Sequence, residues 1–82
     1  MEFSIASMHR IFKQVGGESG KVRVSNDAKE LLRKILDEIA REIAYEAIKL
    51  TYLRGQSTVT EEDVRDAASI VLVRRENSGG EL

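Results

Sequence analysis

A periodic run of apolar residues in the middle of this chain constrains its fold more than any other feature. From Ala28 to Leu50, apolar residues recur every three or four positions, which is the spacing of one face of an α-helix. No glycine or proline interrupts this run before Gly55. We therefore predict one uninterrupted helix over residues 26–53, with a length of about 42 Å.

A helix of this length does not suit a compact monomer. A globular chain of 82 residues is only about 30 Å across, and short helices on either side cannot cover the whole apolar face. A second copy of the chain would supply the missing cover, so the sequence predicts an obligate homodimer. The alternative is a monomeric three-helix bundle with a broken central helix, which the lack of glycine and proline disfavours.

A shorter helix is predicted on each side of the long one. Apolar spacing indicates the first over residues 5–15, where Ser4 can cap its start and Gly16 with Gly17 can end it. Ser25 can cap the long helix. Between them, the segment "KVRV" (21–24) has a brief strand-like alternation.

The third helix is predicted over residues 61–75. Thr60 can accept a hydrogen bond from the backbone N–H of Asp63, and three acidic residues follow Thr60 at the positive end of the helix dipole. The last residues, 76–82, are polar and rich in glycine. We therefore predict one domain over residues 1–75 and a flexible tail over residues 76–82.

The composition disfavours several classes of function. The chain has no cysteine and a single histidine, His9, which leaves no plausible ligand set for zinc. The longest apolar stretch is "IVLV" (70–73), and the N-terminus lacks a signal-peptide pattern. Neither a nucleophile–base pair nor a phosphate-binding loop is recognisable. We expect a soluble intracellular protein that is not an enzyme and that needs no cofactor, small-molecule substrate or membrane.

The net charge of −1 conceals an asymmetry along the chain. Residues 1–34 hold seven lysines and arginines against four acids, whereas the remaining residues hold six against ten. A basic N-terminal segment is the kind of surface that polyanions select, although an ordinary solvated surface would also account for it.

Three stretches resemble archaeal histones: "SIASMHRIFKQVG" (4–16), "VSNDAKELLRKILDEIAREIAYEAIKL" (24–50) and "TVTEEDVRDA" (58–67). The resemblance implies an all-α histone fold, with a short, a long and a short helix, that forms a head-to-tail handshake dimer. The first loop of each protomer would then lie beside the second loop of its partner. The expected dimer core is Leu32, Ile35, Leu36, Ile39 and Ile43.

The resemblance also implies that duplex DNA is the partner. Histones hold DNA mainly through its phosphates and through its deformability, with little reading of the bases. The positions that match or adjoin the family's DNA contacts are two cations of the first helix, two of the first loop, the serine cap of the long helix and two hydroxyls of the second loop. They are Arg10, Lys13, Lys21, Arg23, Ser25, Ser57 and Thr58.

The chain departs from the archaeal histones mainly in its second loop. The family usually has "RKT" where this chain has "QST" (56–58), so Gln56 replaces the arginine that pairs with the acid at Asp63. The contact between residue 56 and Asp63 is then expected to be at best a neutral hydrogen bond, unless the side chain of Arg54 reaches Asp63 instead. The first loop is also about four residues longer than usual, through "ESGK" (18–21).

Assembly beyond the dimer is left open by a second departure. Leu53 stands where the family has a histidine in its dimer–dimer contact. The residues expected at such a contact are Leu50, Leu53, Asp63 and Asp66.

Two functions follow from the resemblance. The chain is predicted to be a DNA-compacting protein of the nucleoid, cytoplasmic and associated with the chromosome. The alternative is a histone-fold interaction module of a transcription or centromere complex, with weak DNA binding. Near-neutral charge and "QST" favour the module, whereas the basic first loop favours the DNA-compacting protein.

Overall fold

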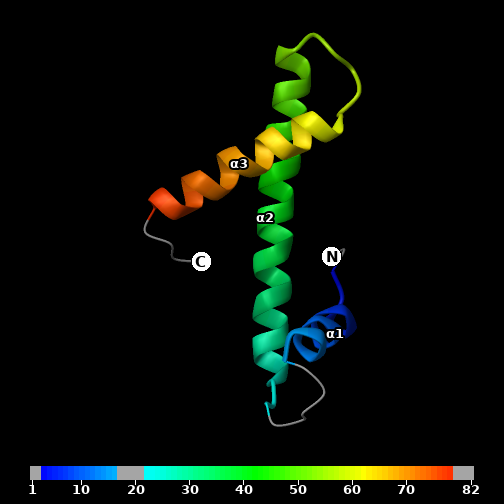
Figure 1. Ribbon diagram of the computed structural model, residues 1–82, viewed down its shortest axis with the longest axis vertical. Helices are drawn as coiled ribbons and strands as arrows, with labels where there is room; N and C mark the ends of the chain where they lie inside the picture. Colours follow the sequence, from blue (N-terminus) through cyan, green and yellow to red (C-terminus); the bar gives the residue numbers. More distant parts are fainter. Residues whose placement is uncertain (1–2, 17–21, 79–82) are drawn as a thin grey trace. The chain divides into compact units, whose positions relative to one another are not determined.

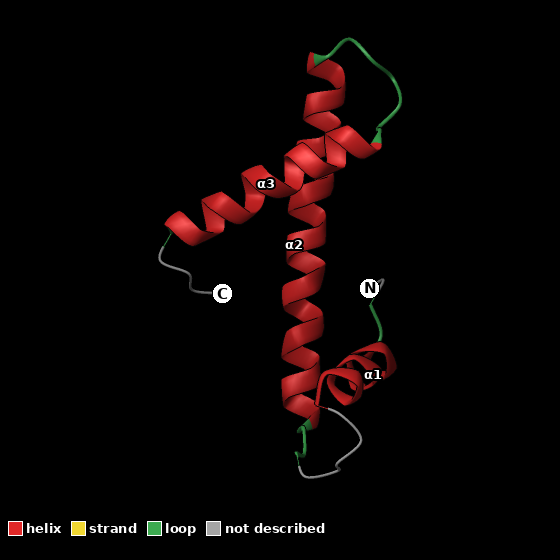
Figure 2. Ribbon diagram, in the orientation of Figure 1, coloured by secondary structure: helices red, strands yellow, loops and turns green. Residues whose placement is uncertain are grey.

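The computed structural model describes residues 3–16 and 22–78 of the chain, and the described residues form three helices and no strand. The helices are α1 (Ile5–Gly16), α2 (Asn26–Leu53) and α3 (Glu61–Asn77) (Figures 1 and 2). None of them is long and apolar enough to cross a membrane. The described residues also contain no cluster of side chains suited to hold a metal ion.

The helix boundaries confirm the predicted layout of a short, a long and a short helix. The long helix spans the predicted residues, while α1 ends one residue later than expected. Helix α3 continues to Asn77, so the first two residues of the predicted tail are helical, and residues 79–82 lie outside the described part of the chain. The strand-like alternation at residues 21–24 is not accompanied by a strand, since residues 22–25 have no regular secondary structure and Lys21 lies outside the described residues.

Each helix begins at a capping side chain. The Ser4 hydroxyl accepts a hydrogen bond from the Ser7 backbone N–H (3.1 Å), and the Ser25 hydroxyl accepts one from the Ala28 N–H (3.0 Å). Thr60 and Asp63 form a complete capping box at the start of α3, in which each side chain accepts from the other's backbone N–H. The three predicted caps are therefore confirmed.

Helix α2 ends in a Schellman turn centred on Gly55. The N–H of Gly55 donates to the carbonyl of Tyr52, and the N–H of Gln56 donates to that of Thr51, both at 3.0 Å. Gly55 has a φ angle of +69°, in the left-handed region that side chains with a Cβ adopt rarely. This glycine fixes the direction in which the chain leaves α2.

Two units of the chain are described separately. The first unit is residues 1–38, with α1 and the beginning of α2, and the second unit is residues 39–82, with the rest of α2 and α3. Among the described residues of the first unit, the buried apolar residue is Met8 of α1. In the second unit they are Ala47 of α2 and Ala67 and Val71 of α3. Both cores are very small.

Candidate nucleic-acid interface

Most described cations of the first unit have no acidic partner among the described residues. Arg10 and Lys13 lie exposed on α1, and Arg23 lies exposed in the segment that leads into α2. Arg10 donates a hydrogen bond from Nη2 to the Ser7 hydroxyl, at 3.2 Å, and this contact involves no carboxylate. Lys29 and Lys34 on α2 also have no carboxylate partner among the described residues, whereas Arg33 is paired with Glu30. This unit therefore offers positive charge that the acids among its described residues do not pair with.

Five cations of the second unit, Arg54 among them, contact carboxylates. Lys49 and Arg74 both contact Glu46, at 3.6 and 3.0 Å, and Arg75 pairs with Glu42. Arg65 lies 3.8 Å from Glu61. Glu46 is 7% exposed, and its hydrogen bond from Arg74 is the main reason that its pKa lies below the ordinary value. The pairs of Arg74 and Arg75 tie α3 to α2, while those of Lys49 and Arg65 lie within one helix.

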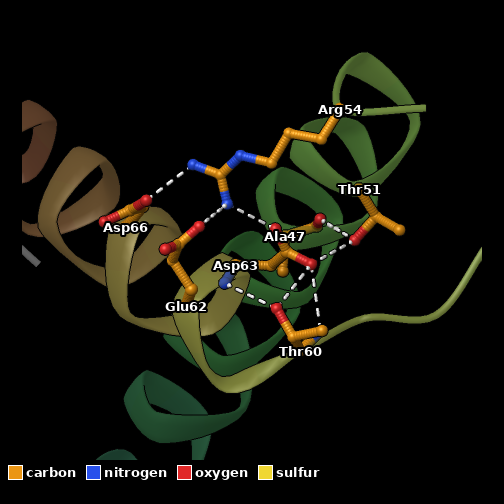
Figure 3. A network of polar contacts seen from close by, with 7 residues as sticks. All are labelled: Ala47, Thr51, Arg54, Thr60, Glu62, Asp63 and Asp66. Carbon is orange, nitrogen blue, oxygen red and sulfur yellow. Dashed lines mark hydrogen bonds and ion pairs between the residues drawn. The ribbon is translucent and has the colours of Figure 1, made fainter. Parts of the chain in front are cut away.

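Arg54 is engaged by three carboxylates at once (Figure 3). It lies just after the last residue of α2 and extends to the first two turns of α3. Its Nη1 is 2.5 Å from Asp63 Oδ1 and 3.4 Å from Glu62, and its Nη2 is 2.6 Å from Asp66 Oδ2. The hydrogen bonds to Asp66 and then to Asp63 raise the pKa of Arg54 above its ordinary value.

Asp63 is the centre of this network, and its side chain is 2% exposed. Its Oδ2 accepts hydrogen bonds from the Thr60 backbone N–H (2.9 Å), the Thr60 hydroxyl (3.1 Å) and the Thr51 hydroxyl (2.9 Å). Chiefly through the Thr60 N–H, and against the opposing effect of burial, these donors and Arg54 lower the pKa of Asp63 to about 2. The carboxylate is therefore ionised and fully satisfied inside the chain.

Residues 1–68 match the family described as "Histone-like transcription factor (CBF/NF-Y) and archaeal histone". The chain belongs to this family. A curated relative, a chain of the archaeal histone HAN1 from Thermococcus zilligii, is 38% identical over 64 residues, which are 78% of this chain and 90% of the relative. The predicted resemblance to archaeal histones and the all-α histone fold are thereby confirmed. The family match ends within α3, so its second half, which carries Arg74 and Arg75, lies beyond the matched residues.

The structure decides between two possibilities that the sequence left open in the second loop of this histone-fold chain, residues 54–60. The loss of an arginine at Gln56 was expected to leave Asp63 with a neutral hydrogen bond at best, unless Arg54 reached it. Arg54 does reach it and forms an ion pair, so the charged clamp is retained from a position two residues earlier. Gln56 is exposed.

The predicted contacts in the second loop are the hydroxyls of Ser57 and Thr58. Both residues are exposed, and neither side chain forms a hydrogen bond with the described residues. They are therefore available to an external partner, but they carry no charge. Lys21, the predicted addition from the first loop, lies outside the described residues.

The predicted dimer core and higher-order contacts remain predictions, since a single chain cannot test them. All five core residues, Leu32, Ile35, Leu36, Ile39 and Ile43, are only half-buried in the single chain. Leu53 is 80% exposed and Leu50 is half-buried. Asp66 is also half-buried and holds Arg54, while Asp63 is buried within its own chain.

Two supporting features were not predicted from the sequence. One is the buried Thr51 hydroxyl, whose single hydrogen lies within reach of two acceptors, the Asp63 carboxylate and the Ala47 carbonyl. The other is a set of two ion pairs between α2 and α3, Glu46 with Arg74 and Glu42 with Arg75. Their spacing contained a signal, because Glu42 and Glu46 are one helical turn apart and so lie on the same face of α2.

Proposed function

We propose that this histone-fold chain binds duplex DNA as a head-to-tail homodimer and compacts it largely without sequence specificity. The role is structural and not enzymatic, and it associates the protein with the chromosome. The observation that carries this proposal is the contrast between the two units. Among the described residues, exposed cations without acidic partners occur in the first unit, while five cations of the second unit contact its own carboxylates.

The small core of the single chain supports a dimer. Among the described residues, only Met8, Ala47, Ala67 and Val71 are buried and apolar, and fourteen large apolar residues are exposed. A lone chain with so much exposed apolar surface would be marginal in stability. A partner that covers the half-buried face of α2 would supply the missing burial.

The free cations support binding to the phosphates of DNA. Arg10, Lys13 and Arg23 form no ion pair with the described residues that a phosphate would have to displace, and the counterions that they release from DNA favour binding. Ser25 caps α2 at its positive end, where backbone N–H groups favour an anion. In a head-to-tail dimer, these groups of one protomer would adjoin Ser57 and Thr58 of the other.

The second loop is expected to contribute only modestly to DNA affinity. Ser57 and Thr58 can donate hydrogen bonds to phosphate oxygens but release no counterion of their own. We therefore propose that DNA affinity depends mainly on the first unit. Assembly of dimers through Leu50, Leu53, Asp63 and Asp66 stays part of the proposal, with Leu53 as its most exposed member.

The alternative function is a protein-interaction module with a histone fold. The exposed Leu53 and the paired charges of the second unit favour it, since such a surface suits a protein better than a polyanion. The two proposals differ in whether the isolated dimer binds DNA at moderate salt.

A gel shift on random-sequence duplex DNA over a series of salt concentrations tests the proposal. The dimer should bind unrelated duplexes alike, and its affinity should fall steeply as salt rises. Arg23→Ala should weaken binding to all duplexes and lower the slope of log affinity against log salt by about one unit per protomer.

The matched control is Arg65→Ala. It removes the same side chain from an exposed position that has only a weak contact with Glu61 at 3.8 Å, and it should leave the slope unchanged. A wild-type dimer that fails to shift DNA even at low salt would contradict the proposal and favour the interaction module.

A further inference from the structure

Arg54 connects the two ends of the second loop. Its backbone follows the last residue of α2, and its guanidinium reaches Glu62, Asp63 and Asp66 in the first two turns of α3 (Figure 3). The middle of the loop has no comparable side-chain contact with the helices. Ser57 and Thr58 are exposed, and their side chains form no hydrogen bond with the described residues.

The charges around Arg54 oppose any direct role in holding phosphate. One guanidinium faces three carboxylates, so the cluster has a formal charge of −2. A phosphate that approached Arg54 would have to displace Asp63 or Asp66 at 2.5 and 2.6 Å, and would meet the remaining acids. The charge of Arg54 is thus committed within the protein.

The geometry of the contacts requires an arginine. Nη1 is directed to Asp63 and Nη2 to Asp66, so the two ends of the planar fork join two carboxylates one turn apart on α3. A lysine has a single ammonium group and cannot hold both with the same directionality. The Arg54 guanidinium therefore sets the distance between the end of α2 and the start of α3, where the loop begins and ends.

We propose that Arg54 is a positioning residue for DNA binding: it orders the second loop so that Ser57, Thr58 and the loop backbone meet the phosphates, and it makes no phosphate contact itself. This inference rests on the proposed function. The loop lacks cations of its own apart from Arg54, so its contribution consists of hydrogen bonds, which depend on accurate geometry more than charge does. A loop that must be ordered during binding costs affinity.

The test measures DNA affinity and its salt dependence for Arg54→Ala in the full chain, well below the melting temperature of each variant. We expect an affinity about twofold to tenfold lower than that of the wild type, the cost of ordering a few side chains. The slope of log affinity against log salt should not change, because no phosphate contact is lost. Arg54→Lys keeps the charge and should also bind more weakly, with the same slope.

Arg74→Ala is the matched control for stability and charge. It removes an arginine that joins α3 to a buried acid of α2, Glu46, at 3.0 Å, but at a point away from the loop. This variant should melt at a lower temperature than the wild type and still bind DNA with unchanged affinity. Arg54→Lys, as the milder change, keeps the test decisive if Arg54→Ala fails to fold.

Three results would overturn the inference. A slope lower by about two units per dimer in Arg54→Ala would show that Arg54 contacts phosphate. An unchanged affinity in a variant with a lower melting temperature would show a structural role alone. Wild-type affinity in Arg54→Lys would show that charge suffices without the fork. None of these three results contradicts the proposed function, because the wild type would still bind DNA. If the wild type itself does not bind DNA, both the proposed function and the inference about Arg54 fail.

Discussion

The hydroxyl oxygen of Thr51 lies 2.9 Å from Oδ2 of Asp63, although twelve residues separate them in the chain. Both side chains are 2% exposed. The same hydroxyl lies 2.8 Å from the Ala47 carbonyl. The contact between α2 and the start of α3 is therefore polar at its centre, and its strength depends on hydrogen bonds as well as on apolar packing.

Thr51→Val should lower the stability of the protein by about 1 kcal/mol. Valine has nearly the shape of threonine, so packing is kept while the bond to Asp63 is lost. The free energy of unfolding from denaturant titrations, at one fixed protein concentration, measures this change. Thr58→Val is the control, because Thr58 is exposed and its side chain has no bond to the described residues. Equal stability of the two variants would show that the buried hydroxyl is unimportant.

The stability of the protein should fall at acid pH partly because of Asp63. Its folded-state pKa of about 2 lies below the ordinary value of 3.8. The ionised carboxylate therefore stabilises the fold at every pH above about 4, and this contribution is lost as pH falls from about 4 to about 2. The lowered pKa of Glu46, bound to Arg74, acts in the same direction.

Asp63→Asn separates the contribution of Asp63 from that of the other acids. At pH 7 this variant should melt at a lower temperature than the wild type, because an amide cannot accept the same donors at both positions. The difference between the two melting temperatures should shrink as pH falls from about 4 to about 2. A difference that stays constant over this range would show that the charge of Asp63 does not contribute to stability.

Folding and dimerisation should be one event. The melting temperature of the wild type should then rise by about 3–6 °C for each tenfold increase in protein concentration. Ile39→Lys should leave little helical protein in circular dichroism, because it places an unpaired charge in the dimer core. Ile39→Val is the control and should fold at a cost of about 1 kcal/mol. A helical wild type that melts at the same temperature at every concentration would rule out the obligate dimer.

Ser57→Lys should strengthen DNA binding. It adds one cation per protomer to an exposed position in a loop that has no free charge, so the slope of log affinity against log salt should steepen by about two units per dimer. Ser57→Ala is the uncharged control and should leave the slope as it is. If Ser57→Lys binds with wild-type affinity and slope, the second loop does not face DNA, as the interaction module would require.

The helices were predictable from sequence because their signals are local. Apolar periodicity defined α2, and the capping residues Ser4, Ser25 and Thr60 marked the starts of all three helices. The end of α3 was less clear, since Glu76 and Asn77 look like tail residues by composition. They extend the helix beyond Arg74 and Arg75, which bind acids of α2.

The polar network could not be fully predicted because it depends on side chains from separate elements. The sequence showed that Gln56 cannot replace an arginine, but only the geometry at the end of α2 showed that Arg54 can. The free cations were easier to identify, because cations outnumber acids in residues 1–34. Which cations stay free and which are paired depends on the packing of α3 against α2.

The anchoring of the second loop has a consequence for variation among such chains. The left-handed Gly55 fixes where the chain leaves α2, and the capping box of Thr60 and Asp63 fixes where it enters α3. The four residues between them, 56–59, are exposed. Substitutions at these four positions need not move either helix. Two proteins could therefore share the same three helices and still differ in the side chains that the second loop exposes.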